Sequence, residues 1–286
     1  MIRTSRPFFV TFLTPAILAA VILVAALFEI LQYSVREFVP GSLDVGGFTL
    51  DNFVRINKPI YWGALANTAY LSLLTALVAL VLSYPVAYAL IRTERDWVRS
   101  TLIALSITPL FTGEIVRTYS WMLMLGSNGF VNSLVEGLSL SDEPLQLMYT
   151  RFGVVIALVQ FSMPVMIILL ATAIAHVDRD VEKAAATLGA GPMTVFWRVT
   201  LPLTSPGILS GVVVVFAWTM SAFSTPQFIG GGKVMMISNL TYLQGFSILN
   251  LPFAATLSVI ALVAALGSLA IVGAMAKRLE KRMAVH

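Results

Sequence analysis

Long uncharged, apolar stretches alternate with short polar segments along the whole chain. The longest of them cover residues 8–28, 59–91, 152–175, 199–232 and 234–276. Since about 20 apolar residues cross the hydrocarbon core of a bilayer, each stretch is long enough to hold a membrane span. A helix buried in a soluble protein does not need such lengths. The pattern therefore predicts a multi-pass membrane protein.

The same pattern predicts an all-α membrane protein with six transmembrane helices. The expected helices cover about 8–36, 62–92, 99–125, 152–176, 204–228 and 253–277. Residues 37–60 and 126–151 are rich in Gly, Pro, Asn, Asp and Ser, which indicates turns and short surface helices. The first apolar run exceeds the apolar region of a signal peptide and lacks a clear cleavage site, so we expect an uncleaved first span.

Basic residues in the connecting segments predict the orientation, because cytoplasmic loops carry an excess of Lys and Arg. With the N-terminus inside, the twelve inner basic residues are Arg3, Arg6, Arg92, Arg95, Arg99, Arg179, Lys183, Arg198, Lys277, Arg278, Lys281 and Arg282, and the five outer ones are Arg36, Arg55, Lys58, Arg151 and Lys233. We therefore expect both termini and the segment 178–202 to be cytoplasmic.

Composition supports the membrane prediction and narrows the chemistry. The chain is 58% hydrophobic and 11% charged, against about a quarter charged in soluble domains. The net charge of +4 belongs to loops beside the membrane, so it does not indicate nucleic acid. The chain has no Cys, and its two histidines, His176 and His286, are far apart in sequence, so no metal site is predicted.

The run Gly230-Gly231-Gly232-Lys233 invites comparison with a phosphate-binding loop. That motif requires a Gly five residues before its last Gly and a Ser or Thr after the Lys. Here those positions hold Gln227 and Val234. Nucleotide binding by this chain is not expected, and neither a cofactor nor a catalytic set is predicted.

Two features within the predicted spans are expected to shape the helices. Prolines at six positions remove a backbone donor and can kink a helix: Pro15, Pro85, Pro109, Pro164, Pro206 and Pro226. Gly207 and Gly211 have the four-residue spacing of a small-residue packing face.

The third predicted span contains the charged pair Glu114 and Arg117. Three residues apart, they lie on one face of a helix and can neutralise each other. An unpaired charge in the bilayer costs free energy, so the two form an internal ion pair that positions the helix, or they and their neighbours Tyr119 and Trp121 line a translocation path.

The most structured polar segment, Asp180–Pro202, lies between two apolar spans. Its sequence predicts a short amphipathic helix and a turn at Gly189, where a residue able to adopt positive φ ends the helix. Pro192 suits the first turn of a second short helix. In a chain that is otherwise nearly all membrane, this loop is expected to bind a partner outside the bilayer.

This segment resembles the cytoplasmic signature loop of permease subunits of binding-protein-dependent ABC importers. The family pattern is Glu-Ala-Ala, three residues, Gly, nine residues, an aliphatic residue, any residue, then Leu-Pro. The positions that match are Ala184, Ala185, Gly189, Val199, Leu201 and Pro202. Lys183 stands where the family usually has Glu, and Glu182 precedes it, so either residue is the candidate charged contact.

The resemblance implies a type I ABC importer permease fold, with five core helices and an additional N-terminal one. It implies a bacterial inner (plasma) membrane complex of two permease subunits, two ATPase subunits and an extracytoplasmic solute-binding protein, surrounded by membrane lipid. ATP would then be hydrolysed by the separate ATPase, and its closure would move the 178–202 loop and switch the path between inward-open and outward-open states. Expected coupling residues are Glu182, Lys183, Ala184, Ala185, Gly189, Leu201 and Pro202.

Two further segments resemble the polyamine (spermidine/putrescine) branch, in which the permease pair is usually a heterodimer. They are the Arg-Thr-Tyr-Ser-Trp run ending at Trp121 and the segment from Ser221 to Gly230. The resemblance implies a polyamine or related amine as substrate, while relatives carry opines, amino-acid-like solutes or aminophosphonates. Expected path residues are Glu114, Arg117, Tyr119, Trp121, Trp218, Ser221 and Phe223.

Domain organisation follows from these segments. We expect an N-terminal helix and outer loop over 1–61, a core permease domain over 62–277 and a cytoplasmic tail over 278–286. The main alternative function is a secondary carrier driven by an ion gradient, but such carriers tend to show repeated broken spans. A membrane enzyme is disfavoured because the spans lack a plausible catalytic set.

Overall fold

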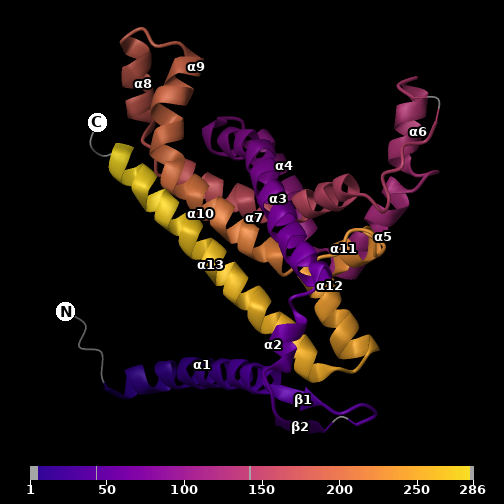
Figure 1. Cartoon of the computed structure of the whole chain (residues 1–286). Coiled ribbons are helices and arrows are strands. Elements are labelled where there is room, and N and C mark those ends of the chain that lie inside the picture. The colour runs from indigo at the N-terminus through magenta and orange to yellow at the C-terminus, as the bar shows by residue number, and fades with distance from the viewer. Residues whose placement is uncertain (1–5, 43, 142, 284–286) are drawn as a thin grey trace. The chain divides into compact units, whose positions relative to one another are not determined.

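The computed structural model describes residues 6–42, 44–141 and 143–283, and almost all of their regular structure is helical (Figure 1). Arg3 and His286, both named above, lie outside the described residues. The chain forms two compact units. One contains the chain up to Trp62 together with Leu240–Val263, and the other contains Gly63–Asn239 and the chain from Ala264.

The first unit contains the N-terminal helix and a small β-hairpin. Its complete elements are α1 (Arg6–Ser34), β1 (Arg36–Phe38), β2 (Val45–Phe48) and α2 (Asp51–Arg55). The strands are antiparallel, with Arg36 opposite Phe48 and Phe38 opposite Val45. The sequence analysis expected turns and short helices here, so the two strands are an addition to the all-α prediction.

Buried polar groups hold this unit together where α1 ends. The Asn52 side-chain amide donates to the carbonyl oxygens of Ser34, at 3.2 Å, and Arg36, at 2.8 Å. The Thr256 hydroxyl also donates to the Ser34 carbonyl, at 3.0 Å. The Ser34 carbonyl belongs to the last turn of α1, where carbonyls lack intrahelical partners, and the Arg36 carbonyl belongs to β1, so Asn52 joins the end of the helix to the hairpin.

The second unit holds most of the helices. Its elements are α4 (Asp96–Ile107), α5 (Glu114–Leu125), α6 (Phe130–Gly137), α7 (Arg151–Ala175), α8 (Arg179–Thr187), α9 (Pro192–Val195), α10 (Leu201–Met220) and α11 (Ser224–Phe228). Three helices have residues in both units: α3 (Pro59–Arg92), α12 (Ile237–Tyr242) and α13 (Leu251–Met283). A 3₁₀ turn covers Thr108–Phe111, and π-helical turns cover Phe196–Thr200 and Leu243–Ser247.

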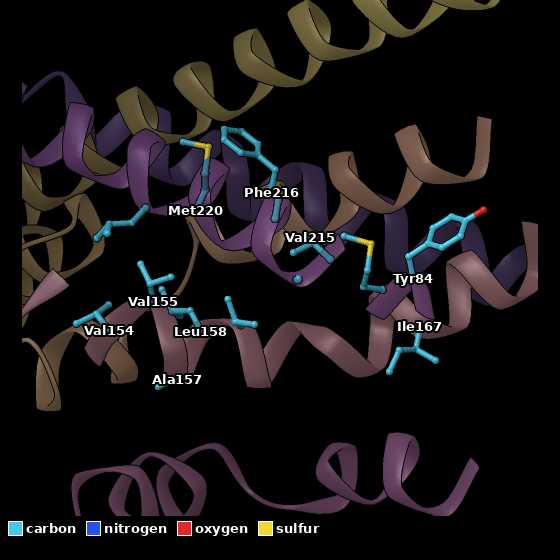
Figure 2. Close-up of a cluster of buried hydrophobic side chains, with 14 of the residues drawn as sticks. Tyr84, Val154, Val155, Ala157, Leu158, Ile167, Val215, Phe216 and Met220 are labelled. Atoms are coloured by element: carbon cyan, nitrogen blue, oxygen red, sulfur yellow. The ribbon is translucent and has the colours of Figure 1, made fainter. Parts of the chain in front are cut away.

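The core of the second unit lies where α3, α7 and α10 pack, and Figure 2 shows several of its side chains. Gly207 and Gly211 face α7 so closely that a Cβ at Gly207 would collide with Ala173, and one at Gly211 would lie 2.7 Å from the Met166 sulfur. The predicted small-residue packing face is therefore confirmed. Such small residues allow membrane helices to approach closely.

The prediction of one continuous helix over 99–125 is wrong. The chain forms α4, the 3₁₀ turn over Thr108–Phe111 and then α5, which begins at Glu114 after Gly113. Pro109 lacks a backbone donor, which explains why the helix does not continue through it. Within the described residues five helices are long and apolar enough to cross a membrane, in α1, α3, α7, Pro192–Met220 and α13.

Candidate functional site

The segment 178–202 folds as the sequence predicted. Asp178 caps α8, because its carboxylate accepts from the Asp180 backbone amide at 2.9 Å. Gly189 ends the first helical piece with φ +87°, and α9 begins at Pro192. Only glycine adopts such a φ without steric cost, so the turn depends on Gly189. Figure 1 shows α8 and α9 as a hairpin beyond one end of α10.

Glu182 points inward from α8. Its Oε1 accepts from the Arg92 guanidinium at 3.0 Å and from the Thr200 hydroxyl at 2.8 Å. The Arg92 and Glu182 side chains are only 13% and 14% exposed. Glu182 therefore makes an ion pair with the last residue of α3 and a hydrogen bond to the turn that precedes α10.

Lys183, one residue later, points outward. Its ammonium lies 2.9 Å from the Asp180 carboxylate, and both side chains are largely exposed, at 73% and 78%. The hydrogen bond that the Lys183 ammonium donates to Asp180 raises the pKa of Lys183. Lys183 is thus charged and accessible to a partner at neutral pH.

Apolar side chains of the same hairpin are also exposed. Leu188 is 90% exposed and Met193 is 69% exposed. Among the remaining residues of the signature pattern, Ala184 and Pro202 are exposed, while Ala185 and Leu201 are half-buried. Exposed apolar groups beside charges are typical of a protein-binding surface. We call the exposed residues Lys183, Ala184, Leu188, Gly189 and Met193 the loop surface.

Arg117 and Glu114 do not form an ion pair, which was one of the two alternatives that the sequence left open for them. The Arg117 guanidinium instead donates to the Pro109 carbonyl at 3.1 Å and lies over the Phe161 ring, 4.3 Å from its centroid. Among the described side chains, ion pairs join Arg92 to Glu182 and Lys183 to Asp180. Glu114, in the first turn of α5, is exposed.

Three helices bring part of the predicted path together. The Phe161 ring, on α7, lies below the Arg117 guanidinium from α5, and it packs roughly at right angles to the Trp218 ring from α10, with centroids 5.5 Å apart. Trp121, one turn after Arg117, donates its indole N–H to the Gln160 side chain at 3.2 Å. We call Arg117, Phe161 and Trp218 the aromatic cluster.

The other predicted path residues lie outside this cluster. Tyr119 is 61% exposed on α5. The Ser221 hydroxyl donates to the Trp218 carbonyl at 2.8 Å, at the end of α10. Phe223 is half-buried in the residues that precede α11.

Sequence reasoning missed Arg92, Gln160 and Phe161 as partners of the predicted residues. Arg92 was identified only as a basic residue of an inner loop, and Gln160 and Phe161 lie in an apolar run without a local motif. The contacts of Gln160 and Phe161 join residues 39 to 57 positions apart, and the contact of Arg92 with Glu182 joins residues 90 positions apart. Helical periodicity carries no information on such separations.

A cavity of about 550 Å³ lies between α3 and α7, and its lining includes Trp121 and Gln160 but no residue of the aromatic cluster. It is lined mainly by apolar side chains, with Tyr70, Trp121, Arg151 and Gln160 supplying the polar atoms. In the described part of the chain no three His, Asp or Glu side chains gather as metal ligands would.

Residues 80–285 match the family model described as the binding-protein-dependent transport system inner membrane component. The chain belongs to this family. It is the permease subunit of an ABC importer, and it is a multi-pass inner-membrane protein. Membership implies in general a partner permease, an ATPase and a binding protein. It favours the importer over the secondary carrier, and a transport role rather than catalysis.

Among curated proteins, the permease is 34% identical over 212 residues to the spermidine/putrescine transport system permease protein PotB of Escherichia coli (strain K12), covering 74% of this chain and 77% of PotB. It is 31% identical over 189 residues to the molybdenum transport system permease protein ModB of Mycobacterium bovis (strain ATCC BAA-935 / AF2122/97), covering 63% of this chain and 69% of ModB.

Solved structures show the fold. A chain of a bacterial alginate ABC transporter in complex with an alginate pentasaccharide-bound periplasmic protein matches with TM-score 0.79 and 18% identity, covering 95% of the permease and 94% of that chain. The MetNI methionine ABC transporter, in an inward-facing conformation, matches with TM-score 0.57 and 15% identity, covering 79% and 99%. These neighbours support the type I ABC permease fold.

Proposed function

We propose that the permease couples to its ATPase through the loop surface on α8 and α9. The observation that carries the proposal is the accessibility of this surface: Leu188, Met193 and Lys183 are all largely exposed at one end of α10. A groove of the ATPase would cover the apolar groups, and an acidic group would pair with Lys183. Closure of the ATPase pair on ATP would then move the loop and switch the path.

The proposal includes the surroundings of the permease. The coupling loop and both termini would be cytoplasmic, the subunit would pair with a second, different permease, and an extracytoplasmic binding protein would deliver the solute. Residues 62–277 would form the core permease domain, with 1–61 as an N-terminal addition and 278–286 as a tail. The basic-residue bias supports this orientation.

For the substrate we propose a polyamine or a related amine. The resemblance to PotB supports this class, and aromatic faces such as those of Phe161 and Trp218 attract cations. The ammonium groups of the substrate would compete with Arg117 for the Phe161 ring. Tyr119, Trp121, Ser221 and Phe223 would line the remaining path, together with Glu114.

A second substrate class is favoured by Arg117 itself. A guanidinium beside the path would bind the carboxylate or phosphonate of an amino-acid-like, opine or aminophosphonate solute. The two classes are separated by uptake into proteoliposomes that contain the whole transporter and its binding protein. Labelled spermidine and putrescine are compared with a labelled amino acid, and uptake of the amino acid alone would overturn the polyamine proposal.

The coupling proposal is tested with Gly189→Asp. A side chain at φ +87° strains the turn by about 1–2 kcal/mol and reorients the loop surface. We expect reduced co-purification of the ATPase and reduced ATP hydrolysis in response to the loaded binding protein. Gly191→Asp is the matched control, because Gly191 has φ −67° and open space around it, and its effect should be smaller. Unchanged assembly and hydrolysis in Gly189→Asp would remove the coupling role.

Orientation is tested by thiol labelling, since the chain contains no Cys. Single cysteines at Leu140 and Met193, which are 73% and 69% exposed, are treated with a membrane-impermeant reagent in intact cells. We expect labelling at 140 alone. Labelling at 193 but not at 140 would reverse the proposed orientation.

A further inference from the structure

The loop that contains α8 is attached to the end of α3 by two arginines that point in opposite directions. Arg92, the last residue of α3, donates to the Val177 carbonyl at 3.1 Å. Arg179, the first residue of α8, donates to the Ile91 carbonyl at 2.7 Å. Ile91 lies in the last turn of α3, where carbonyls lack intrahelical partners. Each arginine therefore satisfies a backbone group of the other segment.

Glu182 completes this attachment. One of its carboxylate oxygens accepts from both Arg92 and the Thr200 hydroxyl, so it joins the end of α3 to the π-helical turn that leads into α10. We propose that Glu182 is a positioning residue rather than an ATPase contact: with Arg92 and Thr200 it forms a clamp that transmits movement of the loop surface to α3 and α10. The proposal rests on the coupling role proposed above for that surface.

The contacts continue from the clamp into the core. Thr204 donates to the Thr200 carbonyl at 2.9 Å and shares a hydrogen bond of 2.9 Å with the Tyr84 hydroxyl. The rings of Tyr84 and Tyr88 both meet Phe196 edge-on, with centroids 5.5 and 6.2 Å apart. Packed, hydrogen-bonded elements of this kind move together and carry coupling between distant sites. Displacement of α8 would therefore move α3 and α10 with it.

The geometry also separates two neighbouring charges that the sequence alone left as equals. The Glu182 carboxylate is 14% exposed and occupied by two donors, whereas the Lys183 side chain is 73% exposed. Lys183 occupies the position six residues before Gly189. The charged contact of the loop surface with an ATPase therefore falls to Lys183, and Glu182 acts within the permease.

The test compares Glu182→Ala, Arg92→Ala and the double variant in the complete transporter in proteoliposomes. We expect the ATPase to remain in the complex, while solute uptake per ATP hydrolysed falls by about tenfold, in the range of coupling between distant sites. The loss in the double variant should be less than the sum of the two single losses, because both substitutions remove the Arg92–Glu182 contact, while each removes one further hydrogen bond of its own. Arg92→Lys keeps a cation and should recover part of the uptake.

Matched controls come from the same end of α3. Glu94 and Arg95 are exposed, and Glu94→Ala and Arg95→Ala remove the same charges without touching the clamp. If Glu182→Ala does not fold, Glu182→Gln is used instead, because it keeps the shape and one acceptor oxygen. Uptake per ATP should also fall in this variant, but by less than tenfold.

Two results would overturn the clamp. One is loss of the ATPase from Glu182→Ala while Arg92→Ala remains assembled and coupled, which would make Glu182 a direct contact. The other is additive losses in the double variant. Failure of the coupling proposal is seen separately, because it would leave ATPase binding unchanged in Gly189→Asp. The clamp fails alone if Gly189→Asp weakens binding while the clamp variants transport normally.

Discussion

Arg92 is the last residue of α3, and Arg117 lies in the first turn of α5. Their guanidinium groups interact with partners of different kinds. Arg92 pairs with a carboxylate 90 residues away, and both side chains are largely buried. Arg117 has a glutamate three residues away but binds a carbonyl and an aromatic ring instead. Nearness in sequence therefore does not decide which charges pair.

The break between α4 and α5 explains the difference. α5 begins at Glu114, so Glu114 and Arg117 lie in its first turn, and the 3₁₀ turn presents the Pro109 carbonyl to Arg117. Glu114 meanwhile lies at a helix N-terminus, where a negative charge is favoured. Arg92 meets the Val177 carbonyl and the carboxylate of Glu182 from α8, and the low dielectric of this largely buried position strengthens the attraction between the two charges.

The largest effect is expected from Arg92→Met. This variant leaves the Glu182 carboxylate buried without its cation, which costs about 3 kcal/mol in comparable sites. Thermal unfolding of the purified permease in detergent measures the loss. Arg95→Met removes an exposed arginine three residues later and should unfold near the wild-type temperature. Equal shifts in the two variants would show that the clamp contributes nothing specific.

Thr200→Val should have the next largest effect. Valine keeps the shape of threonine but removes the hydroxyl that donates to Glu182 at 2.8 Å. A hydrogen bond to a charged group contributes about 1.5 kcal/mol. We therefore expect the free energy of unfolding to fall by about half as much as in Arg92→Met. Combined with Arg92→Met, the loss should be less than the sum, because the two donors share one oxygen. Additive losses would place Thr200 outside the clamp.

Hydropathy and local motifs predicted much of this fold, for specific reasons. The apolar runs located α1, α3, α7 and α13 because span length is set by the bilayer. Gly189 predicted where the helix α8 stops and Pro192 predicted where α9 begins, because the backbone angles that these two residues favour do not depend on distant parts of the chain. The break at Pro109 was not predicted, since membrane helices tolerate proline when neighbouring groups satisfy the freed carbonyls.

The candidate sites were predictable only in part. The signature spacing identified the loop, and some of its residues are exposed, but the spacing could not show that Glu182 is buried and Lys183 is exposed. That assignment depends on Arg92, which enters from another helix. Likewise Trp218 and Arg117 were named from the sequence, while Phe161, which both of them contact, was not.

Arg117→Met should cost less than either change in the clamp. It removes a hydrogen bond to Pro109 and a cation from the face of Phe161, and such a contact contributes about 1 kcal/mol at a partly exposed site. Phe161→Leu removes the ring and with it the contacts to both Arg117 and Trp218, so the loss in the double variant should be less than the sum of the two single losses. Thermal unfolding of the three variants measures the coupling, and fully independent effects would contradict the aromatic cluster.

The smallest effect is expected from Glu114→Gln, and it decides whether the two arginines truly differ. The exposed Glu114 side chain loses only its favourable position at the start of α5, which contributes about 0.5 kcal/mol or less. No ion pair joins Glu114 to Arg117, and only a weaker electrostatic interaction through space couples them, so the change in unfolding temperature should be nearly the same in the wild-type and Arg117→Met backgrounds. A markedly larger loss in the wild-type background would mean that Arg117 depends on Glu114 after all. Both arginines would then depend on a carboxylate, and Arg117 would no longer differ from Arg92 in the kind of partner it binds.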